Sequence, residues 1–302
     1  MKTLKNKVVA ITGAGSGIGR ALAVLCATNG AKLAISDINE MGLAETKGLV
    51  RGLGAKVHAA RVDVADRAAV YAWAAAVKAA LGPADVIVNN AGVSLSETIE
   101  RMNLDDFEWL MGINFWGVVY GTKAFLPQLL KRPAANIVNI SSVFGLIGVP
   151  TQSAYNAAKF AVRGFTESLR QELAATKVRV TVVHPGGIRT NIVRNGRHYH
   201  DPLGDPIDTA RLAAEFAQTA RTTPEAAALQ ILDAILQERP RLLIGADAYV
   251  IDWMQRLLPD SYDQMLATAL RLRPRAPRAQ RRTAAKSRTA VRGTKMNAPF
   301  RR

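Results

Sequence analysis

Short apolar runs that alternate with stretches of helical spacing constrain the fold of this chain more than any other feature. The runs are nearly continuous in Val, Ile, Leu and Ala, which is typical of strands covered on both faces. The predicted strands are Val8–Thr12, Lys32–Ser36, Lys56–Val62, Asp85–Asn89, Asn136–Ser141, Arg179–His184 and Arg241–Ile244. The predicted helices between them are Ile18–Thr28, Met41–Gly52, Arg67–Leu81, Leu104–Lys131, Ala154–Ala175 and Pro224–Gln237. Because strand–helix–strand units form right-handed crossovers between parallel strands, we expect an α/β fold with a doubly wound sheet of about seven parallel strands and helices on both faces.

The distribution of charge divides the chain into a body and a basic tail. The net charge of the 302 residues is +16, but residues 271–302 contain 12 Lys or Arg and no Asp or Glu. We expect a single folded domain over residues 1–270 and a disordered tail over residues 271–302, because the tail has much charge and few apolar residues. Such a tail could bind nucleic acid or an anionic membrane through phosphate groups, yet we favour a solubilising appendage with no specific partner.

The composition excludes several classes of protein. A single cysteine, Cys26, is incompatible with a disulfide scaffold or a cysteine-based zinc site, and we predict no metal ion. His198 and His200 resemble a metal-binding pair, but no carboxylate or thiol cluster at ligand spacing accompanies them. No apolar run approaches the roughly 18 residues of a membrane span, and the N-terminus is not typical of a secretory signal. We therefore expect a cytoplasmic protein.

A glycine-rich turn follows the first predicted strand and opens the first predicted helix. Its sequence over residues 12–20 is TGAGSGIGR. Glycines let the backbone turn sharply and approach a pyrophosphate, and the N-terminus of the following helix favours phosphate groups. The residues of this turn that we predict to bind a dinucleotide are Gly13, Ser16, Gly17, Ile18 and Gly19. Together with the expected sheet, the turn predicts a Rossmann fold.

An acidic residue, Asp37, follows the second predicted strand at the position where a ribose would lie. A carboxylate there can accept both ribose hydroxyls of an adenosine and would repel a 2′-phosphate. Neither Ser16 nor Ile38 is the Arg or Lys that a 2′-phosphate would require. We therefore expect NAD rather than NADP as the cofactor, with a helix N-cap or turn role of Asp37 as the alternative.

Tyr155 and Lys159 stand four residues apart in a predicted helix, so their side chains share one face. A free tyrosine has a pKa of about 10, and a nearby ammonium stabilises the phenolate and lowers that pKa. Such a pair can remove a proton from an alcohol, or donate one to a carbonyl that is being reduced. The alternative is a solvated helix surface, where this spacing is common.

Further motifs follow the predicted strands in order, beside the patterns TGxxxGxG and YxxxK. They are Asp63–Val64, Asn89–Gly92 (NNAG) and Pro185–Thr190 (PGGIRT). In these motifs the chain resembles the ordinary, non-extended branch of the short-chain dehydrogenase/reductase (SDR) family, from about Lys7 to Thr190. The resemblance implies that more residues bind the cofactor. They are Asp63 and Val64 near the adenine, Asn90, Ala91 and Gly92 after the fourth strand, Pro185, Gly186, Ile188 and Thr190 by the nicotinamide, and Tyr155 and Lys159.

The same resemblance completes a catalytic set. The interval between serine and tyrosine in the family selects Ser142, rather than Ser141, as the group that holds the substrate oxygen against Tyr155. It also implies that Asn114 lies at a helix distortion, where its backbone carbonyl binds a water beside the lysine. The predicted catalytic residues are Asn114, Ser142, Tyr155 and Lys159, with Tyr155 as the general acid and base.

The expected function is hydride transfer between NAD(H) and a secondary or lipophilic alcohol or ketone. Residues 239–259 are similar to a subgroup of the family that acts on lipophilic alcohols, and residues 191–223 are expected to cover the substrate. The resemblance implies a homodimer or homotetramer paired through the long fourth and fifth helices. The competing hypothesis is a dinucleotide-binding sensor or scaffold that binds nucleic acid or an anionic membrane through its tail.

Overall fold

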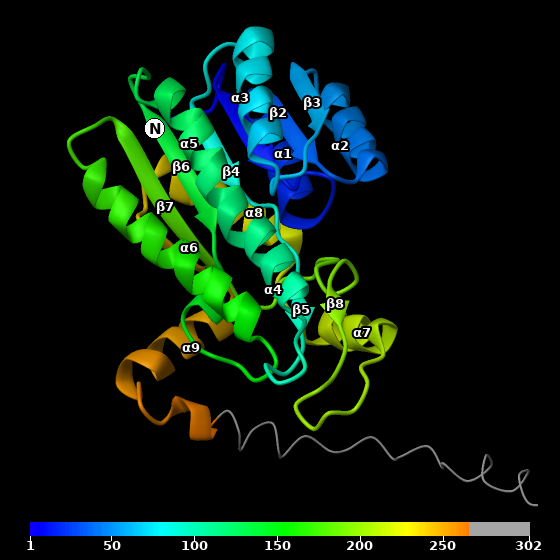
Figure 1. Cartoon of the computed structure of the whole chain (residues 1–302). Helices are drawn as coiled ribbons and strands as arrows, with labels where there is room; N and C mark the ends of the chain where they lie inside the picture. Colours follow the sequence, from blue (N-terminus) through cyan, green and yellow to red (C-terminus); the bar gives the residue numbers. More distant parts are fainter. Residues whose placement is uncertain (266–302) are drawn as a thin grey trace, which may run out of the picture. The chain divides into compact units, whose positions relative to one another are not determined.

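The computed structural model describes residues 1–265, and a parallel sheet lies at its centre (Figure 1). The strands run in the order β3-β2-β1-β4-β6-β7-β9, and every neighbouring pair is parallel. Their bounds are β1 Val8–Thr12, β2 Lys32–Asp37, β3 Val57–Arg61, β4 Val86–Asn89, β6 Ala135–Ile140, β7 Val178–Pro185 and β9 Arg241–Ile244. The order reverses between β1 and β4, which is the switch point where such sheets bind ligands. The predicted doubly wound Rossmann fold is confirmed.

Helices cover both faces of the sheet. One face carries α1 (Gly17–Thr28), α2 (Glu40–Gly52) and α8 (Pro224–Leu236). The other face, turned toward the viewer in Figure 1, carries α3 (Arg67–Leu81), α5 (Gly117–Leu129) and α6 (Ser153–Glu172). Each face buries its own apolar cluster, and in the second the rings of Trp73 and Phe125 meet edge to face at 5.1 Å between centroids. The strands therefore need apolar side chains on both sides, as their composition predicts.

The long helix predicted over Leu104–Lys131 consists of three elements. They are α4 (Leu104–Met111), a π-helical turn (Gly112–Trp116) and α5. A π turn inserts an extra residue into a helix and is frequent at functional sites. Asn114 lies in the middle of this turn and is fully buried. The distortion that the resemblance implies for Asn114 is thus present.

Two short strands and two α-helices were not predicted, and all of them follow the carboxyl ends of the sheet strands, at the lower end of Figure 1. They are β5 (Leu95–Ser96) and β8 (Arg197–His198), which form a second, parallel sheet, and the helices α7 (Thr209–Thr219) and α9 (Ala246–Leu257). A strand of two residues is too short to show a pattern. The segment 191–223, expected only as a polar covering insertion, therefore contains β8 and α7.

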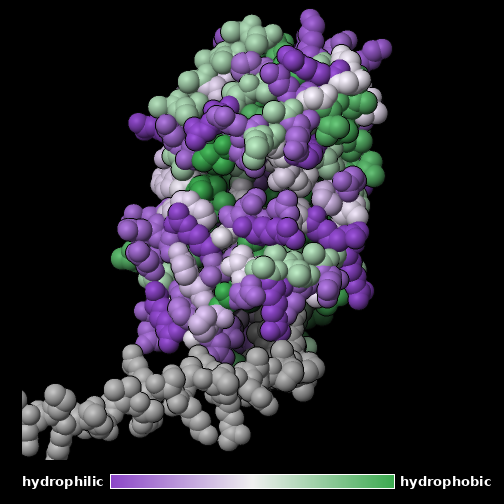
Figure 2. Space-filling model, turned by 90° about the vertical axis from the view of Figure 1, so that its right-hand side faces the viewer, coloured by the Kyte–Doolittle hydropathy of each residue, from purple (hydrophilic) through white to green (hydrophobic). Residues whose placement is uncertain are grey.

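Residues Met1–Pro259 form one compact unit. The tail predicted over residues 271–302 lies outside the described part of the chain. On the face shown in Figure 2, hydrophobic side chains are interspersed among hydrophilic ones. Within residues 1–265, no helix is both long and apolar enough to cross a membrane.

The two histidines considered as a metal-binding pair contact protein groups. His198 Nδ1 lies 2.8 Å from Ser96 Oγ, and His200 Nδ1 lies 2.7 Å from Glu97 Oε2. These contacts tie the segment that contains β8 to β5 and to the residue after it. No three His, Cys, Asp or Glu side chains gather as metal ligands in the part of the chain that the structure describes.

Candidate active site

Hydrogen bonds join the glycine-rich turn to the segment after β4. The Thr12 hydroxyl accepts from the backbone N–H groups of Asn90 (3.0 Å) and Ala91 (3.1 Å). The Asn90 amide Nδ2 donates to the carbonyls of Thr12 (2.9 Å) and Gly13 (3.1 Å). The carboxyl ends of β1 and β4 are therefore locked together at the switch point. The structure places Asn90 and Ala91 beside the turn, and their contact with a cofactor stays a prediction.

The turn is too tight for side chains at two of its glycines. Gly13 has a φ of +65°, and a Cβ there would lie 2.7 Å from the Cα of Ala91. A Cβ on Gly19 would lie 2.2 Å from the Gly13 carbonyl oxygen. Ser16 precedes α1 without a capping hydrogen bond from its side chain, and the first N–H groups of a helix lack acceptors within the helix. This open turn at a helix N-terminus fits the pyrophosphate of a dinucleotide.

Asp37 faces the same turn from the end of β2. Its Oδ2 accepts from the Gly15 N–H (2.7 Å), and its Oδ1 accepts from the Asn39 N–H (2.8 Å). The N-cap of α2 is Asn39, whose side chain accepts from the Gly42 N–H. The N-cap alternative for Asp37 is therefore wrong, whereas the turn role is real and holds the carboxylate beside the glycines.

Two further cofactor candidates, Asp63 and Val64, lie after β3. Asp63 Oδ1 accepts from the Ala65 N–H (2.9 Å), which fixes the direction of this short turn. Val64 is buried, and a Cβ on Gly117 would lie 2.8 Å from its Cγ2. Val64 therefore packs against the start of α5, and Asp63 lies just before it in the turn after β3.

The segment after β7 approaches the glycine turn from the other side. Ile188 is buried and forms an isolated bridge with Thr222, while a Cβ on Gly17 would lie 3.1 Å from the Thr190 methyl. The Gly187 N–H donates to Asp247 Oδ2 (2.7 Å) from the first turn of α9. Asp247 was not singled out from the sequence, because nothing in its neighbourhood indicates a partner 60 residues away.

Ser142 and Tyr155 meet beyond the end of β6. Ser142 precedes a short 3₁₀ turn, Val143–Gly145, and its hydroxyl accepts from the Phe144 N–H (3.1 Å). The same side chain is hydrogen-bonded to Tyr155. Ser141 instead donates to the backbone carbonyl of Lys159 (2.8 Å). Of the two adjacent serines, Ser142 is thus the one that faces the tyrosine.

Burial controls the protonation of the Tyr155–Lys159 pair in α6. Desolvation raises the pKa of Tyr155 to about 12, although the hydrogen bond with Ser142 opposes this rise. Desolvation also lowers the pKa of Lys159 to about 8. The Lys159 ammonium donates to the Ile140 carbonyl (3.0 Å) and lies 5.6 Å from the centre of the Tyr155 ring. Burial thus sets the direction of the Tyr155 pKa shift in this structure, and a lowering of that pKa by the Lys159 ammonium stays a prediction.

Asn114 holds the loop that faces the lysine. Its Oδ1 accepts from the Val93 N–H (2.9 Å), and its Nδ2 donates to the Val93 carbonyl (2.8 Å). A Cβ on Gly92 would lie 3.3 Å from Asn114 Oδ1 and 3.6 Å from Lys159 Nζ. The structure therefore brings Asn114 and Gly92 close to Lys159.

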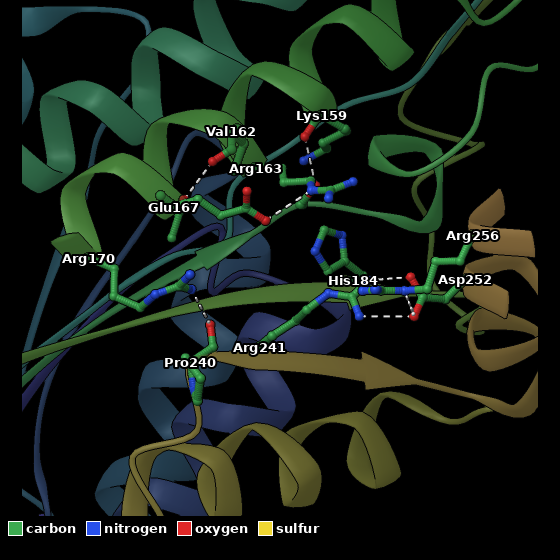
Figure 3. Close-up of polar contacts among 12 residues, drawn as sticks. Lys159, Val162, Arg163, Glu167, Arg170, His184, Pro240, Arg241, Asp252 and Arg256 are labelled. Atoms are coloured by element: carbon green, nitrogen blue, oxygen red, sulfur yellow. Dashed lines mark hydrogen bonds and ion pairs between the residues drawn. The ribbon is translucent and has the colours of Figure 1, made fainter. Parts of the chain in front are cut away.

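His184 lies beside a polar cluster of Arg241, Asp252 and Arg256 (Figure 3). His184 Nδ1 lies 3.0 Å from the Ser142 carbonyl, so Nδ1 carries the proton, and burial lowers the pKa of His184 to about 4. Beside it, Arg241 at the start of β9 donates to both carboxylate oxygens of Asp252 on α9, and Arg256 donates to the same carboxylate. Sequence reasoning missed this cluster, whose members come from three separate elements.

Known proteins share this fold and these motifs. A family model described as short chain dehydrogenase matches residues 7–200. SadH of Mycobacterium tuberculosis, a proposed oxidoreductase, is 45% identical over 273 residues, which cover 89% of this chain and 97% of that protein. Estradiol 17-beta-dehydrogenase 11 of Homo sapiens is 33% identical over 264 residues, which cover 86% of this chain and 82% of that protein.

A solved structure is also similar. The crystal structure of a short-chain dehydrogenase/reductase from Burkholderia phymatum in complex with NAD has a TM-score of 0.78 at 30% identity, and the match covers 88% of this chain and 97% of that chain. The NAD in that relative supports a nicotinamide dinucleotide as the cofactor here. Motifs, sheet order and relatives agree: the chain belongs to the short-chain dehydrogenase/reductase family of oxidoreductases.

Proposed function

We propose that this protein transfers a hydride between NAD(H) and a secondary or lipophilic alcohol or ketone. The observation that carries the proposal is the meeting of Ser142, Tyr155 and Lys159 at the carboxyl edge of the sheet that also bears the glycine turn. The Ser142 hydroxyl and the Tyr155 phenol can hold an alcohol oxygen, and the phenol can take its proton beside the Lys159 ammonium. A bound nicotinamide dinucleotide supplies the carbon that accepts the hydride.

In the proposed reaction, the Ser142 and Tyr155 hydroxyls hold the substrate oxygen. Tyr155 removes the hydroxyl proton as the C–H bond of the alcohol breaks, and it returns the proton when a ketone is reduced. The tyrosine must then have a pKa well below the value of about 12 that burial imposes. Lys159 can lower it if the ammonium turns from the Ile140 carbonyl toward the phenol oxygen. A water held by the backbone carbonyl of Asn114 would then pass the proton toward solvent.

Preference for NAD over NADP forms part of the proposal. The Asp37 carboxylate is held beside the glycine turn by the Gly15 N–H, where it can accept ribose hydroxyls and repel a 2′-phosphate. The nearest guanidinium on α1, that of Arg20, is engaged by the Gly42 carbonyl and by Glu45. Its donors are thus already paired within the protein.

Assembly into a homodimer or homotetramer is proposed as well. Trp116 at the end of the π turn and Phe160 on α6 expose much of their aromatic surface. Trp116 also stacks on Tyr120, with 5.7 Å between ring centroids. Exposed aromatic groups on two long adjacent helices suit a helix-to-helix contact between subunits.

The test follows the absorbance of reduced nicotinamide with purified protein, NAD or NADP, and a panel of secondary and long-chain alcohols. We expect turnover with NAD, and its loss in Tyr155→Phe, which keeps the ring but removes the hydroxyl. Preference for NADP would contradict the role of Asp37 and leave the catalytic role of Tyr155 intact. Tight NAD binding without turnover of any alcohol would favour the sensor or scaffold hypothesis.

A further inference from the structure

The turn that carries Ser142 begins where the backbone pairing of β6 with β7 ends. The paired register stops at Ile140 and Val183, and the Ser141 N–H donates to the Val183 carbonyl (2.8 Å). Pro185 at the end of β7 has no N–H, so it cannot extend this ladder. The direction in which Ser142 leaves the sheet therefore depends on other contacts.

The side chain of His184 in β7 supplies one of these contacts. The Ser142 carbonyl accepts from His184 Nδ1 (3.0 Å) and from the Gly145 N–H (2.9 Å), so both of its lone pairs are used. The Ser142 hydroxyl accepts from the Phe144 N–H and is hydrogen-bonded to Tyr155. His184 therefore holds the backbone of the residue whose hydroxyl faces the tyrosine.

The imidazole of His184 is fully buried and has one hydrogen bond. Its Nε2 has no hydrogen-bond partner among residues 1–265. A buried nitrogen without a partner is costly, and an apolar side chain at this position would avoid that cost. Arg163 and Arg241 lie beside the ring (Figure 3), and their positive charges disfavour a second proton on it. A neutral ring with a single donor suits one task, which is to hold the Ser142 carbonyl.

We propose that His184 is a positioning residue, which holds the Ser142 carbonyl so that the Ser142 hydroxyl points at Tyr155 and at the substrate oxygen. This role rests on the proposed function, and it assigns no proton transfer to His184 itself. The alternative is a side chain that only fills space in the core. Leucine or phenylalanine would fill that space without a donor. Asparagine would keep the donor, because its amide nitrogen is separated from Cα by the same number of bonds as Nδ1 of histidine.

Turnover of the full chain with NAD and a secondary alcohol separates these roles. We expect His184→Leu and His184→Phe to lower kcat at least about tenfold while NAD binding stays unchanged, and His184→Asn to recover kcat to within about threefold of the wild-type value. The control is Thr181→Val, which removes another buried hydrogen bond of β7, between the Thr181 hydroxyl and the Arg239 carbonyl (2.7 Å). This variant should keep the wild-type kcat.

A double-mutant cycle with Ser142→Ala shows whether His184 acts through the serine hydroxyl. Without that hydroxyl there is nothing left to misdirect, so His184→Leu should lower kcat by less than about a further twofold. A further tenfold loss in the Ser142→Ala background would overturn the proposal. So would an equal loss of kcat in His184→Leu, His184→Asn and Thr181→Val.

Hydrogen–deuterium exchange of the cofactor-free protein needs no turnover, so it separates this proposal from the proposed function. The amides of Phe144 and Gly145 should exchange at least about fivefold faster in His184→Leu than in the wild-type protein, in His184→Asn or in Thr181→Val. Equal exchange in all four proteins would overturn the role of His184. Faster exchange in His184→Leu, in a protein that turns over no alcohol, would support the hold on the Ser142 turn and contradict only the proposed function.

Discussion

Replacing Lys159 with methionine should stabilise the folded protein while it abolishes turnover. Burial lowers the pKa of Lys159 from an ordinary 10.5 to about 8. Each unit of pKa corresponds to about 1.4 kcal/mol, so at pH 7 the buried ammonium destabilises the fold by about 3 kcal/mol. Methionine has a similar length, but it leaves the Ile140 carbonyl without its donor, at a cost of about 1 kcal/mol. The net gain in the free energy of unfolding is about 2 kcal/mol.

The pH dependence of this gain follows from the same pKa values. Below pH 8 both the folded and the unfolded chain keep the ammonium, so the full penalty is present. Between about pH 8 and 10.5 the folded state loses this proton while the unfolded state retains it, and the stability of the wild-type protein rises relative to the variant. At pH 10 the advantage of Lys159→Met should have shrunk by about 2 kcal/mol.

Urea unfolding of the cofactor-free proteins at pH 7 and pH 10, followed by circular dichroism, measures both quantities. Lys123→Met, on the exposed side of α5, is the control, and its effect should stay within about 0.5 kcal/mol at either pH. A Lys159→Met variant that is less stable at pH 7, or whose advantage does not change with pH, would refute the reasoning from burial.

Three other substitutions test the turn and the core. Gly19→Ala should weaken NAD binding in calorimetric titration by more than about tenfold, because the added Cβ would lie 2.2 Å from the Gly13 carbonyl oxygen. The control is Gly48→Ala, whose added Cβ would meet nothing within 4 Å, and this variant should bind NAD normally. Phe125→Ala should lower the free energy of unfolding in urea by about 3–5 kcal/mol, because the ring is fully buried; a loss below about 1 kcal/mol would contradict its core role. Asp85→Ala should cost a similar 3–5 kcal/mol in the same assay, since the buried carboxylate accepts from the Val8 N–H and pairs with Arg132; an unchanged midpoint would show that neither contact matters.

The strands could be predicted from sequence because they are buried on both faces. Five of the seven predicted strands differ from the observed ones by one residue at one or both ends, and Val8–Thr12 and Arg241–Ile244 agree at both ends. A strand between two helix layers must be apolar along its whole length, and such an apolar run can be recognised in the sequence without knowledge of the contacts. The glycine turn can also be recognised in the sequence. The backbone there lies so close to its neighbours that only glycine fits.

Features that depend on distant contacts could not be predicted. The α9 helix carries apolar residues on its exposed side as well as on its buried side, so the sequence does not show which side faces the body. Burial raises the pKa of Tyr155. The spacing of Tyr155 and Lys159 in the sequence does not show how deeply the tyrosine is buried, so this shift could not be predicted. The cluster of His184, Arg241 and Asp252 forms only when β7, β9 and α9 come together.

In the proposed function, the site around Tyr155 passes a hydride directly from an alcohol carbon to NAD. Mass spectrometry of the nicotinamide product tests it most directly, with secondary alcohols that carry deuterium on the carbinol carbon. We expect deuterium in the reduced nicotinamide formed by the wild-type protein, and none above background with Tyr155→Phe. Reduced nicotinamide that contains no deuterium, or equal deuterium transfer by the variant, would contradict it.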